Sequence, residues 1–405
     1  MDTQSSIHAI VIKRLKAYQA ASLAIYGHPE TCNHEYFAQE TLTELLAEDG
    51  FSIKKDVAGH PTGFTAAYKA RKSGPVIVFL AEYDALPGIG HACGHNLFGT
   101  TSSLAAVALK SVIDTVGGEV RVYGTPGEEG GENGSAKASF VREGFFKDVD
   151  AALCVHASRD GHILTCPSLA CAPVDIQFHG KASHAASAPE KGINALDAVI
   201  AVYNSINALR QHLTSDVRIH GIITHGGDVP NVVPDYAAAK FYLRAATAPT
   251  LDAVYKKVED IVRGAALSTG ATGSMTLSQN RVDNTVITPS FDAVYAKELT
   301  AFGLTAEPPA SVKSIGSTDV GNVSQVVPTI QPQIRISPSP IAGHSEAFKK
   351  AAGSKMGLDS VALGGEVLAR TALRLMTEPA LLASIQAEHR AQVARQSNPG
   401  VTEHD

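Results

Sequence analysis

The spacing of apolar residues along the first half of the chain alternates between helical and strand-like patterns. Residues 76–80, Val-Ile-Val-Phe-Leu, form a continuous apolar run that is typical of a strand buried on both faces. Asn96 is expected to cap the helix that follows this strand. The expected helices span residues 7–27, 35–48, 97–113 and 135–143, and the expected strands span residues 51–54, 63–68, 76–80, 119–124 and 151–155. Strands that alternate with helices favour a parallel sheet.

The pattern changes after Pro173. From there the elements follow the order strand, helix, strand, strand, helix, strand, which is the split βαβ pattern of a ferredoxin-like domain. The strands are expected at residues 174–181, 218–224, 236–244 and 274–277, and the helices at residues 194–210 and 251–267. After Pro289 the pattern returns to helix, loop and short strand, with a last helix expected over residues 364–376 and a loose tail after Asn398.

These elements predict an α/β protein with two domains, because a chain of 405 residues is too long for one ordinary core. The larger domain is expected to contain a mixed, mostly parallel sheet and to be formed by residues 1–172 and 286–405. Residues 173–285 are expected to form an inserted α+β domain with ferredoxin-like topology.

Composition narrows the possible functions. The formal net charge of −6, with no run of basic residues, argues against a nucleic-acid partner. No apolar stretch approaches the roughly 18 residues that a membrane span requires, and the N-terminus has no signal-peptide pattern. The five cysteines are few, odd in number and irregularly spaced, which favours reduced thiols and a cytoplasmic location.

Chemically active side chains gather where three successive predicted strands end. The first strand leads to Cys93 and His95, the second to Glu128 and Glu129, and the third to His156. We expect these residues in one site, because parallel strands end at the same edge of a sheet. A thiolate and imidazoles suit zinc or a similar divalent ion, and a carboxylate beside a ligand can accept a proton from water.

Taken singly, each residue has an ordinary structural interpretation. Cys93 can be a core cysteine, His95 can cap a helix, and the two glutamates can be solvated. His156 can be a core histidine, and His344, in Gly-His-Ser-Glu, can be a loop histidine. The shared position at strand ends argues against all of these interpretations holding together.

Three residues of the predicted inserted domain are weaker candidates. His184 can be a surface turn histidine, Asn231 an ordinary residue of a loop bracketed by prolines, and Arg244 a solvated strand end. Signatures of other enzyme classes are missing, including a Gly-x-Ser-x-Gly elbow, a His-Glu-x-x-His helix, a phosphate-binding loop and a Rossmann glycine fingerprint.

The chain resembles the M20 metallopeptidases over nearly its whole length, and within them the amidohydrolase branch, which includes aminoacylases, aminobenzoyl-glutamate hydrolases and the group of peptidase M20 domain-containing protein 2. Four motifs carry the resemblance: Tyr-Asp-Ala-Leu-Pro at 83–87, His-Ala-Cys-Gly-His-Asn at 91–96, Gly-Thr-Pro-Gly-Glu-Glu at 124–129 and Gly-Lys-Ala-Ser-His-Ala-Ala at 180–186. The resemblance implies a catalytic domain with an inserted lid domain that forms homodimers.

The resemblance also implies roles for individual residues. It implies two divalent ions, with zinc favoured over manganese or cobalt, held by Cys93, His95, Glu129, His156 and His344. Glu128 would be the general base, Asp84 the acid behind the metal centre and His184 a residue that reaches the substrate carbonyl, in this family often from the partner subunit. Asn231 and Arg244 would contact substrate. Glu82 occupies a position where many relatives outside this branch have a metal-binding histidine, and it is not counted as a ligand.

The expected function is therefore a cytoplasmic, metal-dependent amidohydrolase that cleaves N-acyl amino acids or dipeptide-like substrates. Two alternatives stay open at this point. One is an amide-forming enzyme of a biosynthetic pathway that uses the same site, and the other is a non-catalytic metal-binding scaffold.

Overall fold

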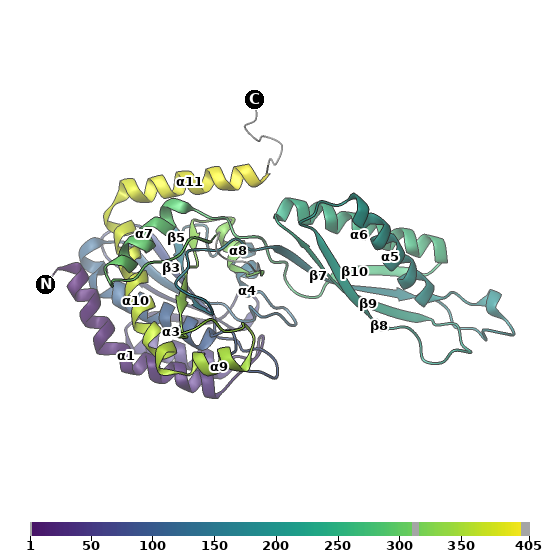
Figure 1. Ribbon diagram of the computed structural model, residues 1–405, viewed down its shortest axis with the longest axis horizontal. Coiled ribbons are helices and arrows are strands. Elements are labelled where there is room, and N and C mark those ends of the chain that lie inside the picture. Colours follow the sequence, from purple (N-terminus) through teal and green to yellow (C-terminus); the bar gives the residue numbers. More distant parts are fainter. Residues whose placement is uncertain (1, 310–315, 398–405) are drawn as a thin grey trace, which may run out of the picture. The chain divides into compact units, whose positions relative to one another are not determined.

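The computed structural model describes residues 2–309 and 316–397 (Figure 1). Within these ranges the chain forms two compact units. The first is built from Met1–Pro167 and Thr285–Asp405, and the second from Ser168–Asn284. The sequence places these divisions after residues 172 and 285. The tail after Asn398, expected to be loose, lies outside the described residues.

A six-stranded sheet with the order β1-β2-β4-β3-β5-β11 forms the centre of the first unit. Strands β3, β4, β5 and β11 run parallel to one another, while β1 and β2 are antiparallel additions at one edge. The strands are β1 (Ser52–Val57), β2 (His60–Lys69), β3 (Val76–Ala81), β4 (Glu119–Gly124), β5 (Ala151–Leu153) and β11 (Thr329–Ile330). The expected mixed, mostly parallel sheet is confirmed, and β4, β3 and β5 end side by side.

The buried strand β3 is followed by α3 (His95–Val116), which packs against it and against α1 (Thr3–Gly27) and α10 (Lys355–Thr377). The expected cap of α3 is wrong. Gly94, with φ 82°, precedes the first helical residue, and Asn96 lies inside the helix, where its amide donates to Ser22 Oγ. A glycine is required here because the left-handed backbone conformation is strained for other residues. The helix can therefore begin one residue after Cys93 and Gly94, with His95 in its first turn.

The remaining helices of the first unit include two differences from the sequence expectation. The last expected helix, over 364–376, is longer at its N-terminal end, since Gly364 packs against Thr101 and continues α10. A further helix, α11, was not expected, because its face is mostly polar and few of its side chains are buried. The other elements are α2 (Tyr36–Glu48), α4 (Ala136–Arg142), β6 (His156–Ser158), α7 (Pro289–Thr300), α8 (Val320–Ser324), β12 (Gln333–Arg335), α9 (Glu346–Ala352) and α11 (Pro379–Ser397).

The second unit is a four-stranded antiparallel sheet with the order β10-β7-β9-β8, and its helices α5 and α6 pack on one face (Figure 1). Its elements follow the expected split βαβ order, which confirms the ferredoxin-like topology. They are β7 (Ala170–His179), α5 (Ala195–Leu209), β8 (Arg218–His225), β9 (Tyr236–Ala245), α6 (Ala248–Thr269) and β10 (Thr272–Leu277). Across residues 2–309 and 316–397, no helix has both the length and the apolar character needed to cross a membrane.

Gly99 on α3 provides a test of how tightly this helix is seated against the strand end. A Cβ atom at Gly99 would lie 2.7 Å from the backbone oxygen of Glu82. We expect Gly99→Ala to lower the free energy of unfolding by about 1–3 kcal/mol through overpacking. Gly264→Ala on α6 is the control: a Cβ there meets nothing within 4 Å, so the helix should gain about 0.5–1 kcal/mol. Urea unfolding of both variants measures the difference, and equal effects would contradict the tight seating of α3.

Candidate metal centre

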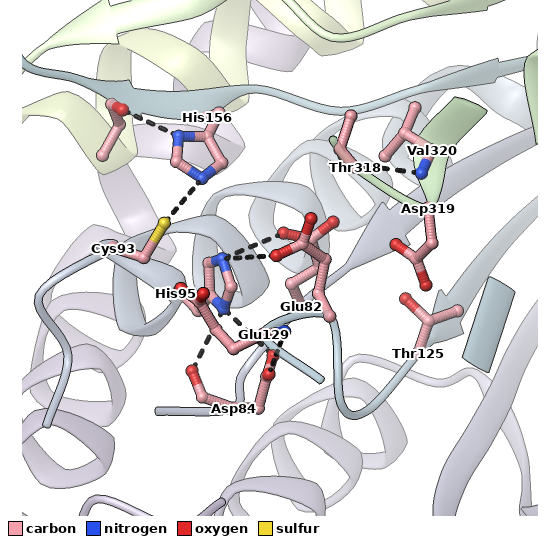
Figure 2. Close-up of polar contacts among 12 residues, drawn as sticks. Glu82, Asp84, Cys93, His95, Thr125, Glu129, His156, Thr318, Asp319 and Val320 are labelled. Atoms are coloured by element: carbon pink, nitrogen blue, oxygen red, sulfur yellow. Dashed lines mark hydrogen bonds and ion pairs between the residues drawn. The ribbon is translucent and has the colours of Figure 1, made fainter. Parts of the chain in front are cut away.

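His95 lies at the start of α3 with its ring held between carboxylates (Figure 2). Its Nδ1 is 3.0 Å from Asp84 Oδ1 and 3.1 Å from the backbone oxygen of Asp84. Both partners are acceptors, so Nδ1 carries the hydrogen and Nε2 faces the site. Burial alone would raise the pKa of Asp84, but the charge and hydrogen bond of His95 lower it. Asp84 therefore fixes the tautomer and orientation of His95, as carboxylates behind metal-binding histidines do.

Cys93 and His156 approach each other at the same edge of the sheet. The Sγ atom of Cys93 is 3.4 Å from Nε2 of His156, while His156 Nδ1 lies 2.7 Å from the Ala157 carbonyl oxygen. Burial lowers the pKa of His156 to about 4, so its imidazole is neutral at pH 7. Burial and the charge of Glu129 raise the pKa of the Cys93 thiol. A thiolate at this position therefore requires a cation nearby.

The loop after β4 brings Glu128 and Glu129 to the same place. The Glu129 backbone N–H donates to Asp84 Oδ2 at 2.9 Å, and Glu129 Oε1 is 3.6 Å from His344 Nε2. Glu128 Oε2 is farther from His95 Nε2, at 3.9 Å. Burial, followed by the charges of Glu82 and Glu129, raises the pKa of Glu128. The structure thus brings together every residue of the first unit that the sequence proposed for the site.

The donor atoms are arranged as a divalent cation requires. Three groups have donors that all lie within 4.8 Å of one another: Cys93 with His95 and His156, Cys93 with Glu129 and His344, and Glu82 with His95 and Glu128. Among the described residues, His95 Nε2 and Glu129 Oε1 are buried and have no hydrogen-bond partner. Buried polar atoms without partners are costly, and a bound cation satisfies them. The residues present therefore fit a metal centre.

Sequence reasoning missed a buried ion cluster beside the centre. The Lys137 ammonium is fully buried, 2.6 Å from Asp319 Oδ1 and 2.8 Å from Glu82 Oε1. The Lys137 backbone N–H also donates to Asp319 Oδ2. Asp319 follows Gly316-Ser317-Thr318, whose small polar residues stood out in the sequence without an assigned role. For Lys137, on a short helix, the sequence carried no signal.

Glu35 is a second residue that sequence reasoning missed. It is fully buried, and its carboxylate accepts hydrogen bonds from the Gly127 backbone N–H at 3.0 Å and from the Thr62 hydroxyl at 2.7 Å. Gly127 directly precedes Glu128, and Asp84 holds the backbone of Glu129. The backbone on both sides of Glu128 is therefore fixed by buried carboxylates.

The second unit places two of its three candidates together. His184 forms a bridge with Val232, and the Ala185 N–H donates to the Asn231 carbonyl oxygen. Arg244 lies near the opposite end of β9, paired in register with Cys171. From Tyr236 to Arg244 the strand spans about 26 Å, at roughly 3.3 Å per residue. Within one copy of this unit, Arg244 is therefore far from His184 and Asn231.

Comparison with known proteins identifies the family. Residues 172–269 match the model of the peptidase dimerisation domain of M20 enzymes. The Xaa-Arg dipeptidase of Mus musculus is 34% identical over 388 residues, which cover 92% of this chain and 89% of the relative. The chain belongs to the M20 peptidase family. One of the two polypeptides of the p-aminobenzoyl-glutamate hydrolase of Escherichia coli is 39% identical over 61% of this chain and 55% of its own length.

Solved structures show the same M20 architecture. A putative aminohydrolase from Staphylococcus aureus matches 90% of this chain and 99% of its own with a TM-score of 0.72 at 19% identity. A dinuclear metal-binding M20 peptidase from Bacillus subtilis covers 91% and 99%, with a TM-score of 0.58 at 19% identity. The fold is therefore that of an M20 catalytic domain with a lid domain. Since the named M20 relatives are peptidases and amidohydrolases, this chain is an enzyme of that class.

Glu35 gives the stability of this M20 enzyme a specific pH dependence. Burial and the charge of Asp84 raise the pKa of Glu35 from 4.5 to about 8. Between these values the folded state binds more protons than the unfolded state, so the contribution of Glu35 to stability falls as the pH rises. We expect metal-stripped Glu35→Gln to gain stability relative to the wild type between pH 5 and pH 8. Urea unfolding across this range measures the difference, and parallel curves for the two proteins would contradict it.

Proposed function

We propose that this M20 enzyme is a metal-dependent amidohydrolase that cleaves the amide bond of N-acyl amino acids or dipeptide-like substrates. The observation that carries the proposal is the convergence of Cys93, His95, Glu129, His156 and His344 beside Glu128. The names of relatives add the substrate class. Relatives 28% identical over about half of this chain include an indole-3-acetyl-aspartic acid hydrolase of Enterobacter agglomerans and an N-acetyl-L-cysteine deacetylase of Bacillus subtilis.

The donor set favours zinc over manganese or cobalt, and it has enough donors for two ions. A thiolate and imidazoles are preferred zinc ligands. Cys93, His95 and His156 form one group, and Cys93, Glu129 and His344 form another, so Cys93 is available to both. Bound divalent ions would supply Lewis acidity that lowers the pKa of water towards neutrality.

Glu128 is suited to the role of general base. Its carboxylate is nearly buried, and its Oε2 lies farther from His95 Nε2 than a second ligand of the same ion would. A carboxylate near the ions but outside their coordination shells can accept the proton of the attacking water. The same carboxyl group then donates that proton to the leaving amine. Arg244 is a candidate to hold the substrate carboxylate, as guanidinium groups do.

Of the alternatives from the sequence, a non-catalytic scaffold finds no support, because the named relatives are enzymes. An amide-forming enzyme would use the same residues in reverse, and no observation favours that direction. We also propose a cytoplasmic location and a homodimer. Five unpaired cysteines support the location, and the match to a dimerisation domain supports the homodimer.

The test is a panel of N-acyl amino acids and dipeptides, assayed with protein reconstituted with zinc, manganese or cobalt. We expect hydrolysis by the wild type and a loss of about 10²–10⁴-fold in kcat for Glu128→Gln, because an amide cannot accept the proton. Metal content, measured by elemental analysis, should be unchanged in the variant. Near-normal turnover by Glu128→Gln would contradict the role of Glu128, and no hydrolysis of any substrate by the wild type would contradict the function.

His184 is suited to stabilise the oxyanion of the reaction. Its ring is exposed, and its Nδ1 accepts hydrogen bonds from the backbone N–H groups of Ala186 and Ser187 at 3.2 and 3.1 Å. The hydrogen of the neutral ring is therefore on Nε2, which is free to donate to a developing negative charge. Because Arg244 lies about 26 Å along the same lid, one dipeptide-sized substrate cannot contact both residues of one copy. We therefore propose that His184 and Arg244 act on one substrate from different subunits.

Mixing two inactive variants tests this arrangement. In a heterodimer of Glu128→Gln and His184→Ala, an in-trans arrangement leaves one site with both residues intact. Activity should then return to a fraction of the wild-type value after subunit exchange. Mixing Glu128→Gln with Glu128→Gln carrying a different affinity tag is the control and should stay inactive. If heterodimers form without any recovery of activity, His184 acts within its own subunit.

A further inference from the structure

Glu82 lies directly at the metal centre, and neither the motifs nor the comparisons assign it a role there. It follows the last residue of β3, and its side chain is fully buried. Figure 2 shows Glu82 on one side of the His95 ring and Asp84 on the other. Oε2 of Glu82 is 3.2 Å from Nε2 of His95, the nitrogen that faces the site.

The partners of Glu82 differ from those of the other buried carboxylates near the loop after β4. Glu35, Asp84 and Asp319 each accept a donor on both oxygens. Lys137 serves both Asp319 and Glu82, but Asp319 also receives its backbone N–H, whereas Glu82 has only Oε1 next to the ammonium. Among the described residues, Oε2 of Glu82 has His95 Nε2 as its neighbour and no hydrogen-bond donor.

The distances separate Glu82 from the general base. A nitrogen and an oxygen that bind the same ion at about 2.1 Å, with angles between 90° and tetrahedral, are about 3.0–3.4 Å apart. The Glu82–His95 separation of 3.2 Å falls in this range. The Glu128–His95 separation of 3.9 Å does not. Both carboxylates belong to the group that converges on His95 Nε2, but only Glu82 is placed as a ligand.

We propose that Glu82 is a further ligand of the divalent ion bound by His95, and that Lys137 is the positioning residue that holds its carboxylate towards that ion. This inference rests on the proposed metal dependence. A buried carboxylate oxygen without a donor requires a positive charge, and an ion at His95 Nε2 provides one. The Lys137 contact fixes the other oxygen, so that Glu82 binds through Oε2 alone.

Metal affinity and coordination, rather than activity, test this role. Metal-stripped wild type and variants are titrated with Zn²⁺ in competition with a chromophoric chelator, and the visible spectrum of Co²⁺-loaded protein reports the ligand set. We expect Glu82→Gln to weaken the binding of one ion at least about tenfold and to change the Co²⁺ spectrum. Asp319→Asn is the matched control: it neutralises an equally buried carboxylate on Lys137 that has no contact with His95. It should change affinity less than about threefold and leave the spectrum as in the wild type. Cys93→Ser is the positive control for loss of a ligand.

Each outcome decides the matter. If Glu82→Gln does not fold, Glu82→Asp replaces it, since the shorter side chain keeps the charge beside Lys137 but withdraws Oε2 from His95. It should show the same loss of affinity and the same spectral change. Equal affinities and spectra for Glu82→Gln and wild type, or equal losses in Glu82→Gln and Asp319→Asn, would overturn the ligand role and leave the proposed function standing. Wild-type protein that binds no divalent ion would overturn both.

Discussion

The structure of the site depends on burying negative charge around one loop, the segment between β4 and α4 that carries Glu128 and Glu129. Glu35 holds the backbone just before Glu128, and Asp84 holds the backbone of Glu129. Asp319 holds the first turn of α4 through Lys137. A loop rich in glycine would otherwise lose much conformational entropy on folding. Charge-assisted hydrogen bonds to buried carboxylates are strong enough to oppose this loss.

The same carboxylates explain why the site has a preference for cations. Their charges act in an interior of low dielectric, where each unpaired charge is expensive. Lys137 is the buried cation beside this site, and it already has two carboxylate partners. The remaining negative charge of Glu82, Glu128 and Glu129 faces the space around His95 Nε2. Folding therefore prepares a site in which divalent ions relieve an electrostatic strain that the chain itself creates, which links metal binding to stability.

The sequence alone predicted the features that follow from periodicity and position. The buried strand 76–80, the parallel sheet and the ferredoxin-like order are set by local apolar patterns, and all three are confirmed. Strand ends in a parallel sheet share an edge, so Cys93, Glu129 and His156 could be placed in one site without a structure. By contrast, α11 has a mostly polar face, and Gly94 rather than Asn96 begins α3. In both cases tertiary packing decides the local structure.

The residues that escaped prediction share a physical character. Glu35, Lys137 and Asp319 act through contacts between segments far apart in the chain, and a single charged residue in a helix or loop is interpreted as solvated by default. Glu82 is the instructive case. It was visible in the central motif, yet its spacing could not reveal which of its oxygens had a donor. Only the side-chain geometry distinguishes a carboxylate satisfied on both oxygens, as in Asp84, from one with an open oxygen beside a metal-binding histidine. In a site built from many acids, the number of donors on each oxygen is therefore more informative about function than the identity of the residue.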